Sequence, residues 1–385
     1  MMKKALLTAT VQQHFTSFHM RYIAMLRESG YQVDVAARDV LGGEIHERLS
    51  AAVDDIYDIP FERSPFSLGN IEAYKQLKSV IDTNDYDFVH CNTPVGGILT
   101  RLAARKARKK GTKVIYTAHG LHFYKGAPKL NWLIFYPIEK IFGRLFCDCL
   151  ITICDEDEAT ARKHKLCKTI RRIHGIGGDD VRFAVCSDEE KLNLRESYGF
   201  DKNCKICLCT GELNQNKNQQ LLINALPAVV TAYPDFKLMF AGIGDNEENL
   251  RELAKELNVE NNIAFLGFRT DVDKLVKMSD FVVSASLREG LPVNIIEGML
   301  NAKPAVVTHN RGHNELVEDG VSGMFVPFGD VSKVEQAFIS FCSDDELCRK
   351  MGKAAYERSK KYSLQSVEKE LNSIYNEIVF SKNDR

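Results

Sequence analysis

Two glutamates between Ser284 and Val307 stand where carboxylates could bind a hydroxylated ligand. The stretch predicts a strand, a short loop and a helix that begins at Pro292, since proline is favoured at the first helical position. The unpaired amides of that helix start, around Gly290 to Val293, are suited to hold an anion such as a phosphate. Glu289 precedes the helix and Glu297 falls in its second turn, so both could accept hydrogen bonds from sugar hydroxyls beside the anion. An ordinary strand-to-helix turn with surface glutamates is the alternative.

Other motifs are weaker signals of chemistry. Gly242 and Gly244 end a predicted strand and permit a close approach of the backbone, but without a third glycine they are no dinucleotide fingerprint. Two acid pairs spell D-x-D: Asp155 with Asp157, and Asp271 with Asp273. We interpret these pairs as acids at helix N-termini, where they complement the helix dipole, and they do not indicate a metal site.

The eleven cysteines predict packing rather than chemistry. Their two tight clusters lack a second C-x-x-C or a histidine pair at zinc spacing. Both clusters lie in apolar or β-branched stretches, where cysteine behaves as a small buried hydrophobe. A metal or redox role is the alternative, and the odd count favours reduced thiols.

Alternating strands and helices must position the candidate residues, because short apolar runs followed by helical patterns predict parallel sheets. In the first part the predicted strands are Lys4–Thr10, Gln32–Ala37, Phe88–Cys91, Lys113–Thr117 and Cys149–Ile153, and the helices are Ser17–Glu28, Ile71–Ile81, Gly97–Lys109 and Asn131–Phe146. In the second part the strands are Lys205–Thr210, Lys237–Ala241, Ile263–Phe265, Phe281–Ser284 and Ala305–Val307, and the helices are Gln219–Thr231, Glu247–Leu257, Pro292–Leu300 and Val331–Cys342.

The pattern predicts an α/β protein of two doubly wound, Rossmann-like domains facing a cleft, with a linker at Gly175–Asp180. Ligands of such sheets bind beyond the carboxyl ends of the strands, so the cleft is the expected active site. The length of 385 residues is also that of two large domains.

Composition excludes several classes of protein. The chain has 44% apolar and 27% charged residues, a globular balance, and a net charge of −1, which disfavours nucleic acid as a partner. The apolar start, Ala5 to Val11, is too short for a signal peptide, and charges interrupt the later apolar stretch from Trp132 to Cys154. We therefore expect a cytoplasmic protein that is soluble or peripheral on the inner face of the cell membrane.

Charge is distributed unevenly along the chain. Residues 1–183 carry 27 basic and 21 acidic side chains, whereas the remainder carries 24 and 31. Residues 101–145 hold eleven basic side chains and one acid, together with the aromatic stretch Asn131 to Pro137. Such a window suits an anionic bilayer, with about 1 kcal/mol for each basic residue near the surface. A solvated helix face beside a buried helix is the alternative.

Several motifs occur in one order along nearly the whole chain. They are FHMRYIAMLRESGYQVDVAA, HCNTPVGGILTRLAA, YTAHGLHFYKG, GELNQNKNQQLLINAL, FLGFRTDV and the Glu289-x7-Glu297 spacing followed by KPAVVTHNRGHNELVEDG. In these motifs the chain resembles the retaining glycosyltransferases of family 4, with the GT-B fold, and among them the bacterial enzymes of capsule and exopolysaccharide synthesis. The resemblance implies an acceptor-side domain at 1–178, a nucleotide-sugar-binding domain at 179–363, and a C-terminal helix, about 364–385, that packs back on the first.

The resemblance also implies roles for residues of the second domain. Glu297 would accept from the nucleotide ribose, Glu289 would lie near the transferred sugar, and the backbone of Gly290 and Leu291 would meet sugar and diphosphate. Lys217, in GELNQNKN, matches the family lysine that neutralises the leaving diphosphate, where a fixed cation stabilises the transition state.

The sequence departs from the family pattern at one position of that motif. Many members carry an arginine directly after its first glycine, where this chain has Glu212. Either another residue supplies a second cation, or Lys217 and the helix amides suffice.

Further positions follow from the same resemblance. His119, in TAHG, would reach the donor sugar across the cleft, and Arg269 and Gly242 would lie on the donor side. A histidine satisfied within its loop and a surface salt bridge are the alternatives for His119 and Arg269. His14 and His19 are candidates for the acceptor side, in a chain that has VQQH where many members have a Gly-Gly loop.

Taken together, these features predict a retaining hexosyl- or N-acetylhexosaminyltransferase without cofactor or metal. Its donor would be a nucleotide sugar, best a UDP-sugar, and its acceptor a lipid-linked or other saccharide. The alternatives are a UDP-sugar epimerase on the same fold, a phosphorylase, for which no pyridoxal lysine is evident, and a non-catalytic scaffolding subunit. A nicotinamide dehydrogenase is disfavoured, because LLTATVQQHF lacks a glycine turn after the first strand.

Overall fold

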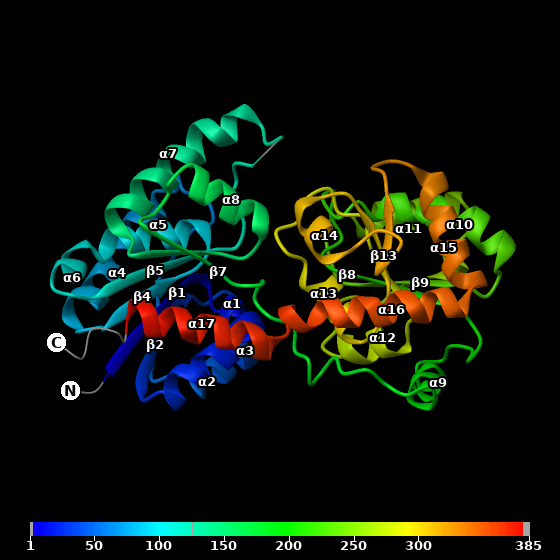
Figure 1. Cartoon of the computed structure of the whole chain (residues 1–385), viewed down its shortest axis with the longest axis horizontal. Helices are drawn as coiled ribbons and strands as arrows, with labels where there is room; N and C mark the ends of the chain where they lie inside the picture. The colour runs from blue at the N-terminus through cyan, green and yellow to red at the C-terminus, as the bar shows by residue number, and fades with distance from the viewer. Residues whose placement is uncertain (1–2, 125, 380–385) are drawn as a thin grey trace. The chain divides into compact units, whose positions relative to one another are not determined.

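The structure is a computed structural model that describes residues 3–124 and 126–379 of the chain. It divides into two compact units: one comprises the chain up to Ile176 together with the segment from Val367 onward, and the other comprises Gly177–Ser366. The first limit falls inside the predicted linker Gly175–Asp180. The chain therefore leaves the first unit once and returns to it for a final helix (Figure 1).

The first unit is built on a seven-stranded parallel sheet in the order β3-β2-β1-β4-β5-β6-β7. Its strands are β1 (Lys3–Val11), β2 (Tyr31–Arg38), β3 (Asp55–Asp58), β4 (Phe88–Cys91), β5 (Lys113–Ala118), β6 (Cys149–Thr152) and β7 (Thr169–Arg172). Its helices are α1 (Gln13–Phe18), α2 (Met20–Glu28), α3 (Gly43–Ser50), α4 (Gly69–Thr83), α5 (Pro94–Ala103), α6 (Arg105–Lys109), α7 (Lys129–Phe146), α8 (Asp155–Lys163) and α17 (Leu364–Ile378). The central strands are buried and mostly apolar because helices cover both faces of the sheet.

Helix α17 completes the core of the first unit. Its Tyr375 ring lies 5.1 Å from that of Phe88, and its hydroxyl lies 2.6 Å from His90 Nδ1, both on β4. Acids of the same helix bond to Arg21 and to His174. Residues 380–385 of the helix predicted over 364–385 lie outside the described residues.

The second unit holds a six-stranded parallel sheet in the order β10-β9-β8-β11-β12-β13. Its strands are β8 (Ile206–Thr210), β9 (Lys237–Ala241), β10 (Ile263–Phe265), β11 (Phe281–Ser284), β12 (Ala305–Thr308) and β13 (Gly323–Val326). Its helices are α9 (Asp188–Ser197), α10 (Gln219–Ala232), α11 (Glu247–Glu256), α12 (Val272–Met278), α13 (Val293–Leu300), α14 (Arg311–Leu316), α15 (Val331–Ser343) and α16 (Asp345–Ser359). Both units are thus Rossmann-like parallel α/β domains, as predicted.

Some predicted elements differ from those observed. The helix predicted over Ser17–Glu28 is two helices that break at His19, and the one predicted over Gly97–Lys109 breaks at Ala104. Pro292 is the residue before α13 rather than its first residue, with an extended ψ of 116°. Within the described residues, every helix is too short or too polar to cross a bilayer.

Candidate functional site

In the second unit, Lys217 and Glu289 meet at the carboxyl edge of the sheet. Lys217 lies in the loop after β8 and Glu289 in the loop after β11, and these strands are neighbours. The Lys217 ammonium donates to Glu289 Oε1 over 2.6 Å. Exposed fractions of 22% and 15% leave both side chains open to a ligand from solution.

Asparagines of the β8 loop hold Lys217 in place. The Asn214 side chain accepts from the Lys217 amide over 3.0 Å, a turn contact typical of asparagine. Asn216 bonds to the β11 loop twice: its carbonyl accepts from the Leu287 amide over 2.8 Å, and its side chain donates to the Arg288 carbonyl over 3.0 Å. The two loops that carry the ion pair are therefore tied together by backbone contacts.

Glycines allow the strand ends to approach closely at this edge. A Cβ added to Gly242, after β9, would lie 1.9 Å from the carbonyl oxygen of Gly211, and one added to Gly244 would lie 2.2 Å from that of Leu213. Gly211 in turn lies against the Lys217 side chain. The missing side chain of Gly242 therefore lets the loop that carries Lys217 pass close to the end of β9. The predicted position of Gly242 beside the donor stays a prediction.

Helix α13 starts beside the ion pair. No side chain caps its first turn among the described residues, so its leading amides are open to a ligand, as a phosphate site requires. Asn294 donates to the carbonyl of Thr210 over 2.8 Å and so fixes the helix start to the end of β8. Gly290 and Leu291 lead into this start, and Leu291 is buried.

Glu297 lies in the second turn of α13, largely enclosed by the protein. Burial raises the pKa of its carboxyl to about 8, with Arg182 lowering it and two nearby aspartates raising it. Within the described residues no group hydrogen-bonds to this carboxylate. An acid whose pKa is raised and whose carboxylate has no protein partner is typical of a residue that binds a ligand.

Arg311 also lies at this site, although it was not predicted from the sequence. Its Nε donates to the Glu289 carbonyl over 3.0 Å, and a Cβ on the neighbouring Gly312 would lie 2.5 Å from the carbonyl oxygen of Gly290. The signal was its place four residues after the predicted strand Ala305–Val307. Arg311 is a candidate for the second cation that Glu212 does not supply.

Arg269 does not join this group. Its guanidinium forms two bonds to Asp271, of 2.8 Å and 2.6 Å, and these bonds help to lower the pKa of that acid to about 2. Its predicted position near the base therefore stays a prediction, and the salt bridge named as the alternative is present.

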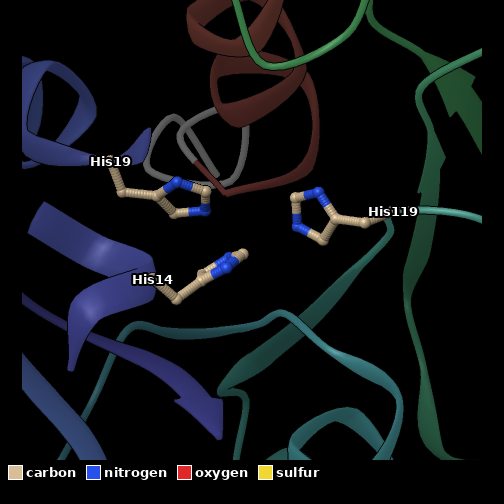
Figure 2. A group of neighbouring side chains, drawn as sticks. All are labelled: His14, His19 and His119. Atoms are coloured by element: carbon tan, nitrogen blue, oxygen red, sulfur yellow. The ribbon is translucent and has the colours of Figure 1, made fainter. Parts of the chain in front are cut away.

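In the first unit, three predicted histidines come together (Figure 2). His14 follows β1, His19 lies between α1 and α2, and His119 follows β5. The centre of the His14 ring lies 4.7 Å from that of the His19 ring and 4.9 Å from that of the His119 ring. The three imidazoles therefore form one cluster at the carboxyl ends of the central strands.

Asn92, directly after β4, links two of these rings and was missed in the sequence. Its side-chain oxygen accepts from His19 Nε2 over 3.1 Å and from His119 Nε2 over 3.0 Å. Its signal was the position after the predicted strand Phe88–Cys91, where a polar residue is expected at a ligand site.

Burial favours the neutral form of these histidines. Burial lowers the pKa of each, that of His119 to about 3. The charge of a protonated His19 would lower the pKa of the other two further. Neutral imidazoles can accept as well as donate, so the cluster could bind hydroxyl groups or ligate a metal.

Comparisons with known proteins agree with this architecture. The family model described as "Glycosyl transferases group 1" matches residues 190–358, and the one described as "Glycosyl transferase 4-like" matches residues 4–153. The chain is 42% identical over 376 residues to EpsD of Bacillus subtilis (strain 168), to which a glycosyltransferase activity is ascribed, with 97% of each chain covered.

Two other proteins resemble the chain more distantly. It is 28% identical to the Escherichia coli enzyme named UDP-Gal:alpha-D-GlcNAc-diphosphoundecaprenol alpha-1,3-galactosyltransferase, over 74% of this chain and 75% of that one. The crystal structure of Anabaena Alr3699/HepE in complex with UDP and glucose superposes with a TM-score of 0.79, at 20% identity, over 97% of this chain and 100% of that one. The latter likeness concerns the fold.

Proposed function

The chain belongs to the family 4-type glycosyltransferases of the GT-B fold, and from that premise we propose that it transfers a sugar from a UDP-sugar to a lipid-linked saccharide in exopolysaccharide synthesis. Glycosyl transfer itself follows from the family. The donor, the acceptor and retention of the anomeric configuration are the proposal.

The observation that carries the proposal is the ion pair of Lys217 with Glu289 beside the open start of α13. A cation and unpaired amides suit a diphosphate, and a carboxylate suits the hydroxyl groups of a sugar attached to it. Glu297, four residues further along the helix, is suited to the ribose of the same ligand. The name of the Escherichia coli relative, which gives a UDP-galactose donor and a diphosphoundecaprenol acceptor, supports UDP and a lipid carrier.

In the proposed reaction, the bond from the anomeric carbon to the diphosphate oxygen breaks and a bond to the acceptor oxygen forms on the same face of the sugar. The acceptor proton passes to the leaving diphosphate. Lys217 stabilises the negative charge that develops on that diphosphate, a contribution of about 10²–10³ in rate for one such group. The role of His119 at the donor sugar is part of the proposal.

The first test is a thermal-shift panel with UDP, GDP, ADP and NAD on the wild type and Glu297→Ala. A ligand at about 100 times its Kd adds roughly 2.7 kcal/mol of stability. We expect UDP to raise the melting temperature of the wild type but not that of Glu297→Ala. A shift with another nucleotide instead would change the donor, and no shift with any nucleotide would contradict the placement of the donor in the second unit.

The second test measures transfer from UDP-sugars to a GlcNAc-diphosphate-lipid, with the anomeric configuration of the product read by NMR. We expect retention, and a rate at least 100-fold lower for Lys217→Ala than for the wild type. Lys205→Ala, on the same strand-loop segment but paired with Asp345, is the matched control. An inverted product, or interconversion of the UDP-sugar without acceptor, would refute the proposed reaction.

We also propose contact with an anionic membrane through α6 and α7 of the first unit. Leu130 and Leu133 of α7 are 61% and 73% exposed, although they are large and apolar. Five of the eleven residues that line a groove beside α6 are basic, and Leu145, Phe146 and Asp148 are among the others. The basic ones are Lys78, Arg105, Lys106, Arg108 and Lys109. Basic side chains beside exposed apolar ones suit an anionic lipid surface.

Flotation with phosphatidylglycerol vesicles tests this contact. The triple variant Arg105→Gln, Lys106→Gln, Lys109→Gln should lose most of its binding, because each basic residue contributes about 1 kcal/mol. The matched control neutralises three exposed basic side chains of the second unit: Arg349, Lys350 and Lys353. Equal flotation of both triple variants would contradict the assigned surface.

A further inference from the structure

The histidine cluster of the first unit has the geometry of a metal site. His14, His19 and His119 each offer one ring nitrogen, and these three nitrogens all lie within 4.8 Å of one another. Figure 2 shows the three rings turned toward a common space. A tetrahedral zinc with bonds of about 2.0–2.1 Å separates its ligand atoms by about 3.3–3.4 Å, so the rings would have to turn inward to hold one.

The fold holds these residues at one point. His14 and His119 follow β1 and β5, and Asn92 follows β4, which lies between them in the sheet. The carboxyl ends of three adjacent parallel strands therefore deliver two of the rings and the asparagine to the same edge. The third ring, His19, is fixed at the break between α1 and α2.

Hydrogen bonds within the protein do not account for all of these nitrogens. Asn92 satisfies one nitrogen of His19 and one of His119. His14 Nε2 and His19 Nδ1 are buried and have no partner among the described residues. Leaving a buried polar atom unpaired costs about 1–3 kcal/mol, so a cluster with two such atoms indicates a missing ligand.

The chemistry of the donor set favours a transition metal. The group consists of three imidazole rings and contains no carboxylate, so a hard cation such as Mg²⁺ or Ca²⁺ is disfavoured. Three histidines with a fourth position left for water or another oxygen are typical of zinc. The Asn92 oxygen accepts from Nε2 of His19 and of His119, so a zinc ion bound at these two atoms would replace both hydrogen bonds.

We propose that His14, His19 and His119 together bind one Zn²⁺ ion per chain, with the fourth position open to water or to an oxygen of a ligand. The site does not depend on the proposed donor or acceptor. Since His119 also has a proposed role at the donor sugar, metal binding is measured directly and not through activity.

The test is equilibrium dialysis of the untagged full chain against buffered Zn²⁺, with the bound metal counted by mass spectrometry. Co²⁺ binding is followed in parallel by its visible absorption, which reports tetrahedral nitrogen ligation. We expect one ion per chain for the wild type, and at least 10-fold weaker binding for His14→Gln. That variant leaves the bonds of Asn92 to the other two rings intact.

His119→Gln is the second variant, and His46→Gln and His309→Gln, at histidines outside the cluster, are the controls. Circular dichroism shows that each variant is folded. We expect the controls to bind as the wild type does. Equal affinity of the wild type and His14→Gln, or a wild-type stoichiometry well below one, would overturn the proposal.

Discussion

At the ion pair of Lys217 and Glu289, a bound phosphate must compete with the glutamate carboxylate for the lysine ammonium. The lysine is already bonded to a carboxylate at 2.6 Å, so a diphosphate must share or displace that partner. Part of the attraction between lysine and phosphate is therefore used to replace an existing contact. The same carboxylate is, in the proposed function, available to the sugar once the lysine turns to the phosphate.

The first prediction concerns this competition. Glu289→Gln should bind UDP about fivefold more tightly, a gain of about 1 kcal/mol, because Lys217 no longer has a charged partner. Isothermal titration with UDP measures the affinity. The matched control, Glu212→Gln, removes the same charge from an exposed position in the lysine loop and should change the affinity much less. Equal gains in both variants would mean that only net charge matters.

The second prediction concerns the buried acid Glu297. Its pKa in the folded state is about 8, above the ordinary value for glutamate, so the folded protein keeps a proton that the unfolded chain releases. Stability from this group is complete at low pH and declines as the pH rises from the ordinary glutamate value to about 8.

Glu297→Gln cannot lose that proton, so its stability advantage over the wild type should grow between pH 5 and pH 8. The slope is at most about 1.4 kcal/mol per pH unit. Urea unfolding at several pH values measures it. A difference between the two proteins that is constant with pH would show that Glu297 titrates normally.

The sequence predicted individual site residues better than it predicted the contacts between them. Lys217 and Glu289 were both predicted, because each lies in a motif of the resemblance, but their direct contact depends on β8 and β11 being neighbours. Asn92 and Arg311 were missed since neither residue type is distinctive alone. His14 and His119, 105 positions apart, become neighbours only through the order of the sheet.

At the scale of elements, α7 packs on its unit mainly through half-buried side chains, among them Trp132, Phe135 and Tyr136. Gly143 is its one buried residue in the described part of the chain, and a Cβ there would lie 2.4 Å from the Leu166 carbonyl oxygen. The helix is also held by Glu139, which bonds over 2.8 Å to the fully buried Arg101 of α5. Arg101 in turn lies 4.1 Å from the centre of the Tyr116 ring.

The third prediction is that Glu139→Gln lowers the free energy of unfolding of the first unit by about 3 kcal/mol. The variant leaves a buried guanidinium without its counter-charge, which is strongly destabilising. Glu196→Gln, which breaks the exposed pair with Lys202, is the control and should change it by under about 1 kcal/mol. Chemical denaturation compares the two, and similar losses would contradict the buried pair.

The fourth prediction separates a close approach from backbone strain. Gly242→Ala should destabilise the second unit and reduce UDP binding, because its Cβ would overlap the Gly211 carbonyl next to Lys217. Gly111→Ala also has a positive φ, of 121°, but its Cβ would meet open space. Thermal unfolding and UDP titration of both variants test this. A loss of UDP binding in the Gly111 variant would point away from the contact.

The strands that the sequence missed all lie at sheet edges: β3, β7 and β13. DIYD of β3 and TIRR of β7 lack an apolar run, and GMFV of β13 has only three such residues after a glycine. The central strands were found because burial on both faces makes them mostly apolar. The breaks at His19 and Ala104 were missed because neither residue is a helix breaker.

At the scale of the whole molecule, two units that fold around separate cores should respond separately. The fifth prediction is that UDP slows hydrogen exchange in the second unit, in the loops after β8 and β11, and leaves the core of the first unit unchanged. Tyr375→Ala should do the reverse and speed exchange in β4, because it removes the partner of His90 and Phe88. Uniform effects over both units would show that they unfold as one.

The return of the chain to the first unit has a consequence for biosynthesis. Helix α17 supplies Tyr375 to the core of the sheet that the ribosome makes first, yet it is translated after all of Gly177–Ser366. Until then the first sheet lacks the Tyr375 partner of His90 Nδ1 and of the Phe88 ring. The first unit is therefore completed after the second one. A nascent chain that stalls before residue 367 would present chaperones with a complete second unit and with a first unit whose core lacks α17.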